Sequence, residues 1–192
     1  EDCPTYTEIG GFTLTKGQVD DDYGAGALLI GNIKMMNSRF IDNVMTGDGM
    51  GGAAHTGGAT LENCYFTGNK AHRYSAVYMW RAAKTINCIV RGNITAPVDG
   101  NEGLSHSVLG LSGPRNGALI SGCTIENNEA PNYPFGAMNG GTDAEGVVHG
   151  IEVRDCIVRN NIIKNPTTAQ AAAIYVSGAE CNVHDCVFEG TQ

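Results

Sequence analysis

The sequence predicts an all-β protein, a right-handed parallel β-helix of about seven coils with three short strands in each. Three observations predict this fold. One unit recurs every 24 to 35 residues along the chain. Within that unit, cysteine and asparagine return at fixed positions. Glycine is abundant (27 residues) and charged residues are sparse (17%), a composition typical of strands and turns.

The repeat becomes visible when one apolar residue of each copy is taken as its anchor. The anchors are Leu14, Phe40, Phe66, Val90, Ile125, Val158 and Phe188. A single copy has too small an apolar face to form a core, so successive copies must stack. We therefore expect one β-helix domain over residues 1–192, as part of a longer chain.

Each copy is predicted to contain a strand, a turn and then a second strand that holds the anchor. Apolar or small residues stand seven and five positions before it, and residues two apart share one face of a strand. Three positions before it stands Gly, Asn or Asp in every copy, and these residues tolerate a left-handed turn. The anchor and the residue two positions before it are again two apart, so they form the inward face of the second strand.

Two columns of the repeat are predicted to form structural ladders along the axis. Amides three positions after the anchors can bond to the coils above and below, and thiols two positions before the anchors behave as small apolar groups. Metal ligands would have to converge, and thiols on parallel stacked rungs have a poor disulfide torsion. We interpret these cysteines as reduced core residues and leave the state of Cys3 open. The ladder residues are Asn43, Asn69, Asn93, Asn128, Asn161, Cys64, Cys88, Cys123, Cys156 and Cys186.

A third strand is predicted before each unit, at 26–30, 53–57, 76–80, 108–112, 147–151 and 172–176. All variation in length falls between the asparagine and this strand, so the loops are expected to leave from one corner. Loops gathered on one side of a solenoid often build a binding face, and they equally often shield a sheet. Both interpretations stay open.

The third strand carries the candidate ligand-binding residues. We take Leu28, Ala54, Val77, Leu109, Val148 and Ile174 as inward, so that their successors face outward. Exposed aromatic and imidazole groups in a row suit sugar stacking and hydroxyl bonding, unless the loops cover them. The outward row is Leu29, His55, Tyr78, Gly110, His149 and Tyr175, with Trp80 beyond Tyr78. His72, Arg73 and Tyr74, beside the shortest loop, complete the predicted contact set.

Charge and hydropathy exclude several partners. The net charge of -8 argues against nucleic acid, whose recognition needs a basic face. No apolar run is long enough to predict membrane insertion. Asp20–Asp22 could bind calcium, but the run matches no calcium-loop motif, so we interpret it as a solvated turn and expect no cofactor.

No complete catalytic motif is present. Glycosidases need two carboxylates facing one bond, and the candidates Asp99, Glu102, Asp143 and Glu145 lie on loops of unknown shape. We therefore favour a protein that is not an enzyme, and leave the enzymatic alternative open.

Short motifs carry a resemblance to a known class. EIGGFTLTKG (8–17), GGAA (51–54), FIDN (40–43) and FTGN (66–69) resemble secreted bacterial right-handed β-helix repeat proteins, and are similar to the repeats of chlamydial polymorphic membrane adhesins. Pectate lyases share this fold. Only two FxxN copies are strict.

The resemblance implies a secreted or bacterial cell-surface module for adhesion or carbohydrate binding, with a glycan or polysaccharide as partner. One alternative is a polysaccharide-degrading lyase or glycosidase with its site on the outward sheet. A second alternative is a structural stalk or passenger segment. Open β-helix ends further predict a longer parent chain, a cap or self-association.

Overall fold

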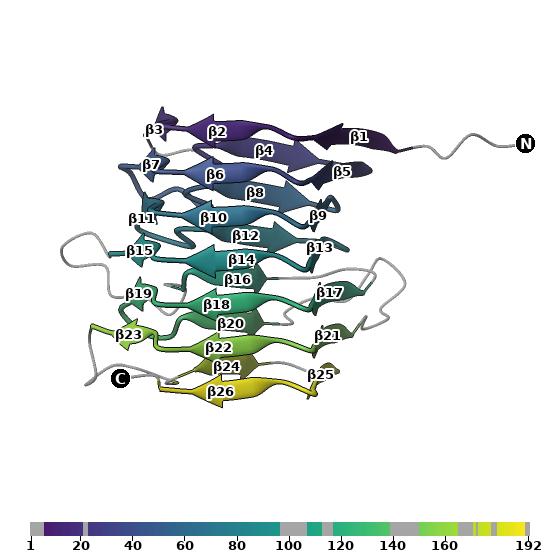
Figure 1. The fold of residues 1–192 in the computed structure, drawn as a ribbon, viewed down its shortest axis with the longest axis vertical. Coiled ribbons are helices and arrows are strands. Elements are labelled where there is room, and N and C mark those ends of the chain that lie inside the picture. The colour runs from purple at the N-terminus through teal and green to yellow at the C-terminus, as the bar shows by residue number, and fades with distance from the viewer. Residues whose placement is uncertain are drawn as a thin grey trace, which may run out of the picture.

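The computed structural model describes residues 6–20, 23–96, 107–112, 117–138, 150–164, 171, 173–177 and 180–190. These residues form strands β1 to β26 and no helix. Parallel pairing of equivalent strands builds four sheets that run the length of the molecule, with β1 at one end and β26 at the other (Figure 1). The fold is a parallel β-helix of about seven coils, as the repeat predicted.

Sheets 1 and 2 contain the two strands on either side of the predicted turn. Sheet 1 consists of β1 (Thr7–Gly10), β5 (Ile33–Met36), β9 (Thr60–Glu62), β13 (Lys84–Ile86), β17 (Ala118–Ser121), β21 (Ile151–Arg154) and β25 (Cys181–His184). Sheet 2 consists of β2 (Thr13–Thr15), β6 (Arg39–Ile41), β10 (Tyr65–Thr67), β14 (Ile89–Arg91), β18 (Thr124–Glu126), β22 (Ile157–Arg159) and β26 (Val187–Glu189).

Sheet 3 was not predicted: it adds a fourth, very short strand to the three expected in each coil. Its two-residue strands follow the asparagine column and are too short to show an alternating pattern in the sequence. They are β3 (Gln18–Val19), β7 (Val44–Met45), β11 (Lys70–Ala71), β15 (Ile94–Thr95), β19 (Glu129–Ala130) and β23 (Ile162–Ile163).

Sheet 4 closes each coil and lies behind sheet 2 in Figure 1. It consists of β4 (Ala27–Ile30), β8 (Ala54–Gly57), β12 (Val77–Trp80), β16 (Leu109–Ser112), β20 (Phe135–Met138) and β24 (Ile174–Ser177).

Two details of sheet 4 correct the sequence analysis. The fifth strand is β20, which pairs Phe135 with Leu109 and takes the place in sheet 4 that was predicted for 147–151. Ile151 begins β21 of sheet 1, and 147–149 lie outside the described residues. Residues 139–150 therefore connect sheet 4 to sheet 1, and the length variation is not confined to one corner. In β4 the predicted faces were reversed: Leu29 is buried, whereas Leu28 is exposed beside His55.

The turns between sheets 1 and 2 explain the Gly, Asn and Asp column. All seven residues three positions before the anchors have positive φ, from Asn37 at 50° to Gly11 at 77°. Glycine has no Cβ penalty in this region, and Asn and Asp tolerate it better than other residues do. A second left-handed column, two positions after the anchors, was missed by the sequence analysis; it consists of Lys16, Asp42, Gly68, Gly92, Asn127, Asn160 and Gly190.

The core consists of equal side chains stacked from coil to coil. Phe40 and Phe66, two successive anchors, stack with ring centroids 4.7 Å apart. The thiols of Cys64, Cys88 and Cys123 are buried in an adjacent column and form no disulfide. Hydrogen bonds with neighbouring thiols, together with burial, raise the pKa of Cys88 well above its usual value.

The asparagine column forms a continuous amide ladder inside the turn between sheets 2 and 3. The Nδ2 group of Asn69 donates to Oδ1 of Asn93 at 2.8 Å, and Asn93 donates in turn to Asn128 at 3.0 Å. The second Nδ2 hydrogen of Asn93 bonds to the carbonyl of Phe66 at 3.0 Å. Asn43, Asn69, Asn93, Asn128 and Asn161 are fully buried. Burial is tolerated because each amide is hydrogen-bonded.

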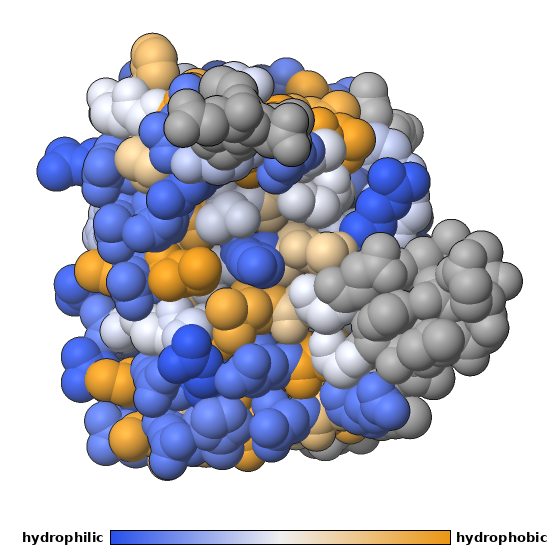
Figure 2. Space-filling model, turned by 90° about the vertical axis from the view of Figure 1, so that its right-hand side faces the viewer, coloured by the Kyte–Doolittle hydropathy of each residue, from blue (hydrophilic) through white to orange (hydrophobic). Residues whose placement is uncertain are grey.

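The outer face of sheet 1 is mainly hydrophilic, as Figure 2 shows. Lys34 Nζ bonds to Glu62 Oε2 at 2.7 Å across successive coils, and Arg154 bonds to Glu152 at 3.1 Å. Exposed ion pairs of this kind add little stability but keep the face in water. The apolar surface that needs an explanation lies on another side, over sheet 4.

Candidate functional site

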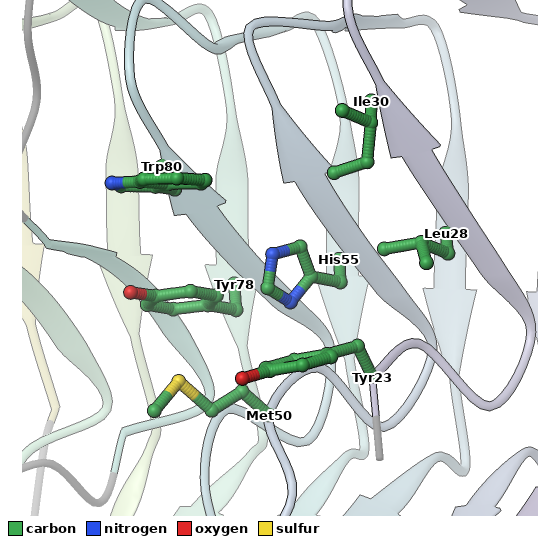
Figure 3. A pocket seen from close by; sticks show the side chains of 7 residues that line it. All are labelled: Tyr23, Leu28, Ile30, Met50, His55, Tyr78 and Trp80. Atoms are coloured by element: carbon green, nitrogen blue, oxygen red, sulfur yellow. The ribbon is translucent and has the colours of Figure 1, made fainter.

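A hollow of about 340 Å³ lies on the outer face of sheet 4, over its first three strands β4, β8 and β12. Its lining is mainly apolar and aromatic, with a few polar groups at the ends of rings. Figure 3 shows the side chains that surround it: Tyr23, Leu28, Ile30, Met50, His55, Tyr78 and Trp80.

Strand register places five of these residues in two outward rows. Leu28, His55 and Tyr78 are aligned neighbours on β4, β8 and β12. Two residues further along, Ile30, Gly57 and Trp80 form the second row. A Cβ atom on Gly57 would lie 2.9 Å from Ile30 Cδ1 and 3.6 Å from the Trp80 ring. The Ile30 side chain therefore extends over Gly57 toward Trp80, in space that a side chain at position 57 would take.

The remaining wall comes from the turns that precede sheet 4. Tyr23 and Met50 form a parallel bridge, and Met50 forms a second one with Arg73 of the next coil. Arg73 Nη2 bonds to Asp48 Oδ2 at 2.9 Å, which ties two successive turns together. Stacked turns thus hold Tyr23 and Met50 against the sheet, as seen at the bottom of Figure 3.

Ring contacts fix the aromatic side chains of the hollow. The His55 ring meets Tyr23 edge to face at a centroid distance of 4.6 Å and Tyr78 at 4.9 Å. Tyr74 packs against Tyr78 at 4.7 Å. Because His55 is buried between its neighbours while Tyr23 remains exposed, a preformed surface of rings faces the opening. Such a surface loses little conformational freedom when a ligand binds.

Loop tyrosines cover the middle of sheet 4. The Tyr74 ring occupies the space where a side chain on Gly110 would lie. Tyr133 fills the equivalent space at Gly136, at 2.7 Å from the Cβ position, and stacks on Tyr175 at 5.0 Å. Burial raises the pKa of the Tyr133 phenol. The two interpretations of the loops therefore apply to different parts of the sheet: they cover the middle and leave the first three strands open.

The structure brings three of the predicted contact residues together, namely His55, Tyr78 and Trp80. Tyr74 is buried behind Tyr78, and Arg73 is bound to Asp48 in the adjoining turn, with His72 beside it. Tyr175 lies three strands beyond Tyr78 in sheet 4, or about 14 Å at the usual strand spacing. His149 lies outside the described residues.

Four residues of the hollow were missed by the sequence analysis: Tyr23, Leu28, Ile30 and Met50. Tyr23 follows the aspartate run that we had interpreted as a solvated turn, and Met50 lies in a turn without an alternating pattern. Leu28 and Ile30 lie in an all-apolar run with the buried Leu29, so the sequence did not indicate that they face outward.

Within the described part of the chain, no three His, Cys, Asp or Glu side chains converge in a way that could hold a metal ion. Asp20 accepts a hydrogen bond from the Thr46 hydroxyl at 2.8 Å, and the other two aspartates of the run lie outside the described residues. No helix in the described ranges is long and apolar enough to cross a membrane.

In comparisons with known proteins, the chain matches no family model, no curated protein and no solved structure. The fold is therefore established by its own repeat and strand pairing. The likeness to adhesin repeats rests on the short motifs quoted above.

Proposed function

We propose that the protein is a carbohydrate-binding module of the adhesin type, secreted or held at a bacterial surface, which binds a saccharide in the hollow over β4, β8 and β12. The carrying observation is the preformed set of aromatic faces from Tyr23, Tyr78 and Trp80 around one opening. The volume of about 340 Å³ falls within the range of small-molecule sites.

The chemistry of the lining supports a sugar ring. One face of a pyranose presents C–H groups with a small positive charge, and these pack on the electron-rich face of an aromatic ring. Figure 3 shows the rings of Tyr78 and Trp80 edge-on and one above the other, both projecting from β12. The phenol groups of Tyr23 and Tyr78 and the indole N–H of Trp80 offer hydrogen bonds to sugar hydroxyls.

Binding is favoured over cleavage by the composition of the lining. None of the seven lining residues has a carboxyl group. Hydrolysis of a glycosidic bond generally uses two of them on opposite sides of the bond. A structural stalk would need no hollow, and the exposed apolar area of Tyr23, Leu28 and Ile30 would then have no role.

The test is binding of the wild-type protein to a glycan array, followed by calorimetric titration with the strongest hit. Trp80→Ala removes one wall of the hollow, and we expect a loss of affinity of about tenfold or more, since aromatic contacts contribute on the order of 1 kcal/mol beyond area burial. Tyr65→Ala is the matched control, because Tyr65 is half-buried on the outer face of β10 in sheet 2.

Two results would contradict the proposal. One is the absence of any saccharide ligand on a broad array. The other is equal affinity of the wild type, Trp80→Ala and Tyr65→Ala for the strongest hit, because the ligand would then lie elsewhere. Unchanged urea midpoints of both variants show that the fold is intact.

A further inference from the structure

An arginine packs on Trp80, one of the residues that line the hollow. Arg81 directly follows Trp80 at the end of β12, and its guanidinium carbon lies 4.3 Å from the centroid of the Trp80 ring. The side chain is exposed to solvent. Stacking on the indole restricts the guanidinium while leaving its N–H groups available to a ligand.

The backbone of Arg81 is unusual for its position. In the two preceding coils, the residue after the sheet 4 strand is Gly31 with φ of 95° and Gly58 with φ of 82°. Arg81 adopts the same left-handed region with φ of 61°. A side chain at such a corner costs free energy that glycine does not. In the sequence, the residues that follow the other strands of sheet 4 are Gly113, Asn139 and Gly178.

Arg81 also differs from the cations that form ion pairs elsewhere on the surface. Among the described residues it has no carboxylate within ion-pair distance. Among the other described cations, Lys16, Arg39, Lys70 and Lys84 share this unpaired state, whereas a carboxylate lies within 4 Å of each of Lys34, Arg73, Arg91, Arg154, Arg159 and Lys164. Arg81 is thus a strained, restrained and unpaired cation beside an aromatic hollow.

We infer that the saccharide held in the hollow is acidic and that Arg81 binds its carboxylate. This inference rests on the proposed function and adds the class of sugar. The guanidinium lies over the indole ring, 4.3 Å from its centroid, so a carboxylate on a sugar packed beside Trp80 is positioned to meet its N–H groups. The planar guanidinium binds a carboxylate through two parallel hydrogen bonds, which gives selectivity for carboxylate over hydroxyl.

Because the chain as a whole is negatively charged, recognition of an acidic sugar requires a cation close to the binding site. With a net charge of -8, the protein does not attract anions in general. Selectivity for an acidic sugar therefore has to come from a group close to the bound ring. A cationic ligand, which aromatic rings also attract, is disfavoured by Arg81 on the Trp80 ring.

The experiment compares ligands that differ only in charge. The probes are short oligomers of glucuronate, mannuronate and galacturonate, together with their methyl esters, titrated at constant low salt. We expect at least one acid to bind the wild type about five- to tenfold more tightly than its ester, the usual effect of a charge-assisted hydrogen bond at a partly exposed site.

Arg81→Gly is the decisive variant, because glycine occupies the same corner in the preceding coils and the fold should be retained. It should abolish the preference, so that the acid binds no more tightly than the ester. Arg81→Lys should retain only part of the preference, since an ammonium cannot form the bidentate pair.

Three outcomes would overturn the inference. They are equal affinity of the wild type for acid and ester, retention of the preference in Arg81→Gly, and binding of neutral sugars only. In the last case the proposed function stands, provided that Trp80→Ala still weakens binding of the neutral ligand. If no saccharide binds at all, both the inference and the proposed function fail.

Discussion

Replacement of Asn93 by alanine tests whether the amide ladder holds the coils together. The Asn93 side chain makes four hydrogen bonds. Its Nδ2 donates to Phe66 O and to Asn128 Oδ1, both at 3.0 Å. Its Oδ1 accepts from Asn69 N at 3.1 Å and from Asn69 Nδ2 at 2.8 Å. Asn93→Ala removes all four and leaves their partners in a buried space.

The expected loss follows from these four bonds. A buried hydrogen bond contributes about 0.5–1.5 kcal/mol net, so four of them give a loss of about 2–6 kcal/mol in the free energy of unfolding. We expect a value near the middle of that range, about 4 kcal/mol, because water that enters the vacated space replaces some of the lost partners. Such a loss is a large fraction of the free energy of unfolding of a typical folded protein, which is about 5–15 kcal/mol.

Urea denaturation followed by circular dichroism measures this loss. With a denaturant slope of about 2–3 kcal/mol per molar, the midpoint should fall by about 1–2 M. Asn63→Gly is the control, in the preceding coil. Asn63 is exposed at the left-handed turn, with φ of 53°, so glycine should keep stability within about 0.5 kcal/mol.

A loss below about 1 kcal/mol for Asn93→Ala, or an equal effect of Asn63→Gly, would refute the reasoning that buried amide bonds fix this turn. A changed denaturant slope would instead indicate that the coils on either side of Asn93 unfold separately, since solenoid repeats interact only with their neighbours.

Two further predictions concern other parts of the surface. Gly110→Ala places a methyl group against the buried Tyr74 ring and should cost about 1–3 kcal/mol in urea denaturation, because ring and sheet cannot both keep their positions; an unchanged midpoint would show that the ring has room to move. A hydrogen bond of 2.7 Å between His184 Nδ1 and the accepting Asp185 Oδ2 raises the pKa of His184 above its usual value. The resulting stabilisation is present below the unfolded-state pKa and is lost as pH rises through the folded-state pKa. Asp185→Asn should lower the His184 pKa in an NMR titration, and an identical titration curve would contradict the pairing.

Several features of the fold were readable from the sequence because they repeat. Asn37, Asn63 and Asn87 occupy a column where only residues that tolerate left-handed backbone occur, and all three have φ near 50°. Likewise, Asn69 and Asn93 recur at one position because each amide needs an identical partner in the next coil. A single asparagine would not indicate a turn or a ladder, but its recurrence at the same position in successive coils does.

The strands of sheet 4 were harder to assign. Ala27 to Ile30 are all apolar, so an alternating pattern could not decide which of them face inward, and pairing of Ala27 with Ala54 decided it. Residues 147–151 have the composition of a strand, yet β20 at Phe135–Met138 takes the place in the sheet. Pairing with the strands of the coils above and below decides which segment joins the sheet, and composition does not reveal that pairing.

By itself, the sequence determined the period of the repeat and, through it, the stacked coils, the buried cysteine column and the positions of the asparagine turns. These features depend on contacts between equivalent residues, so their spacing along the chain is sufficient to identify them. The hollow was decided only by the tertiary structure. It depends on Tyr23 and Met50 in irregular turns, on Gly57, over which Ile30 packs, and on Tyr74 covering Gly110. These residues are not equivalent in the repeat, and only the packing of turns against the sheet brings them together.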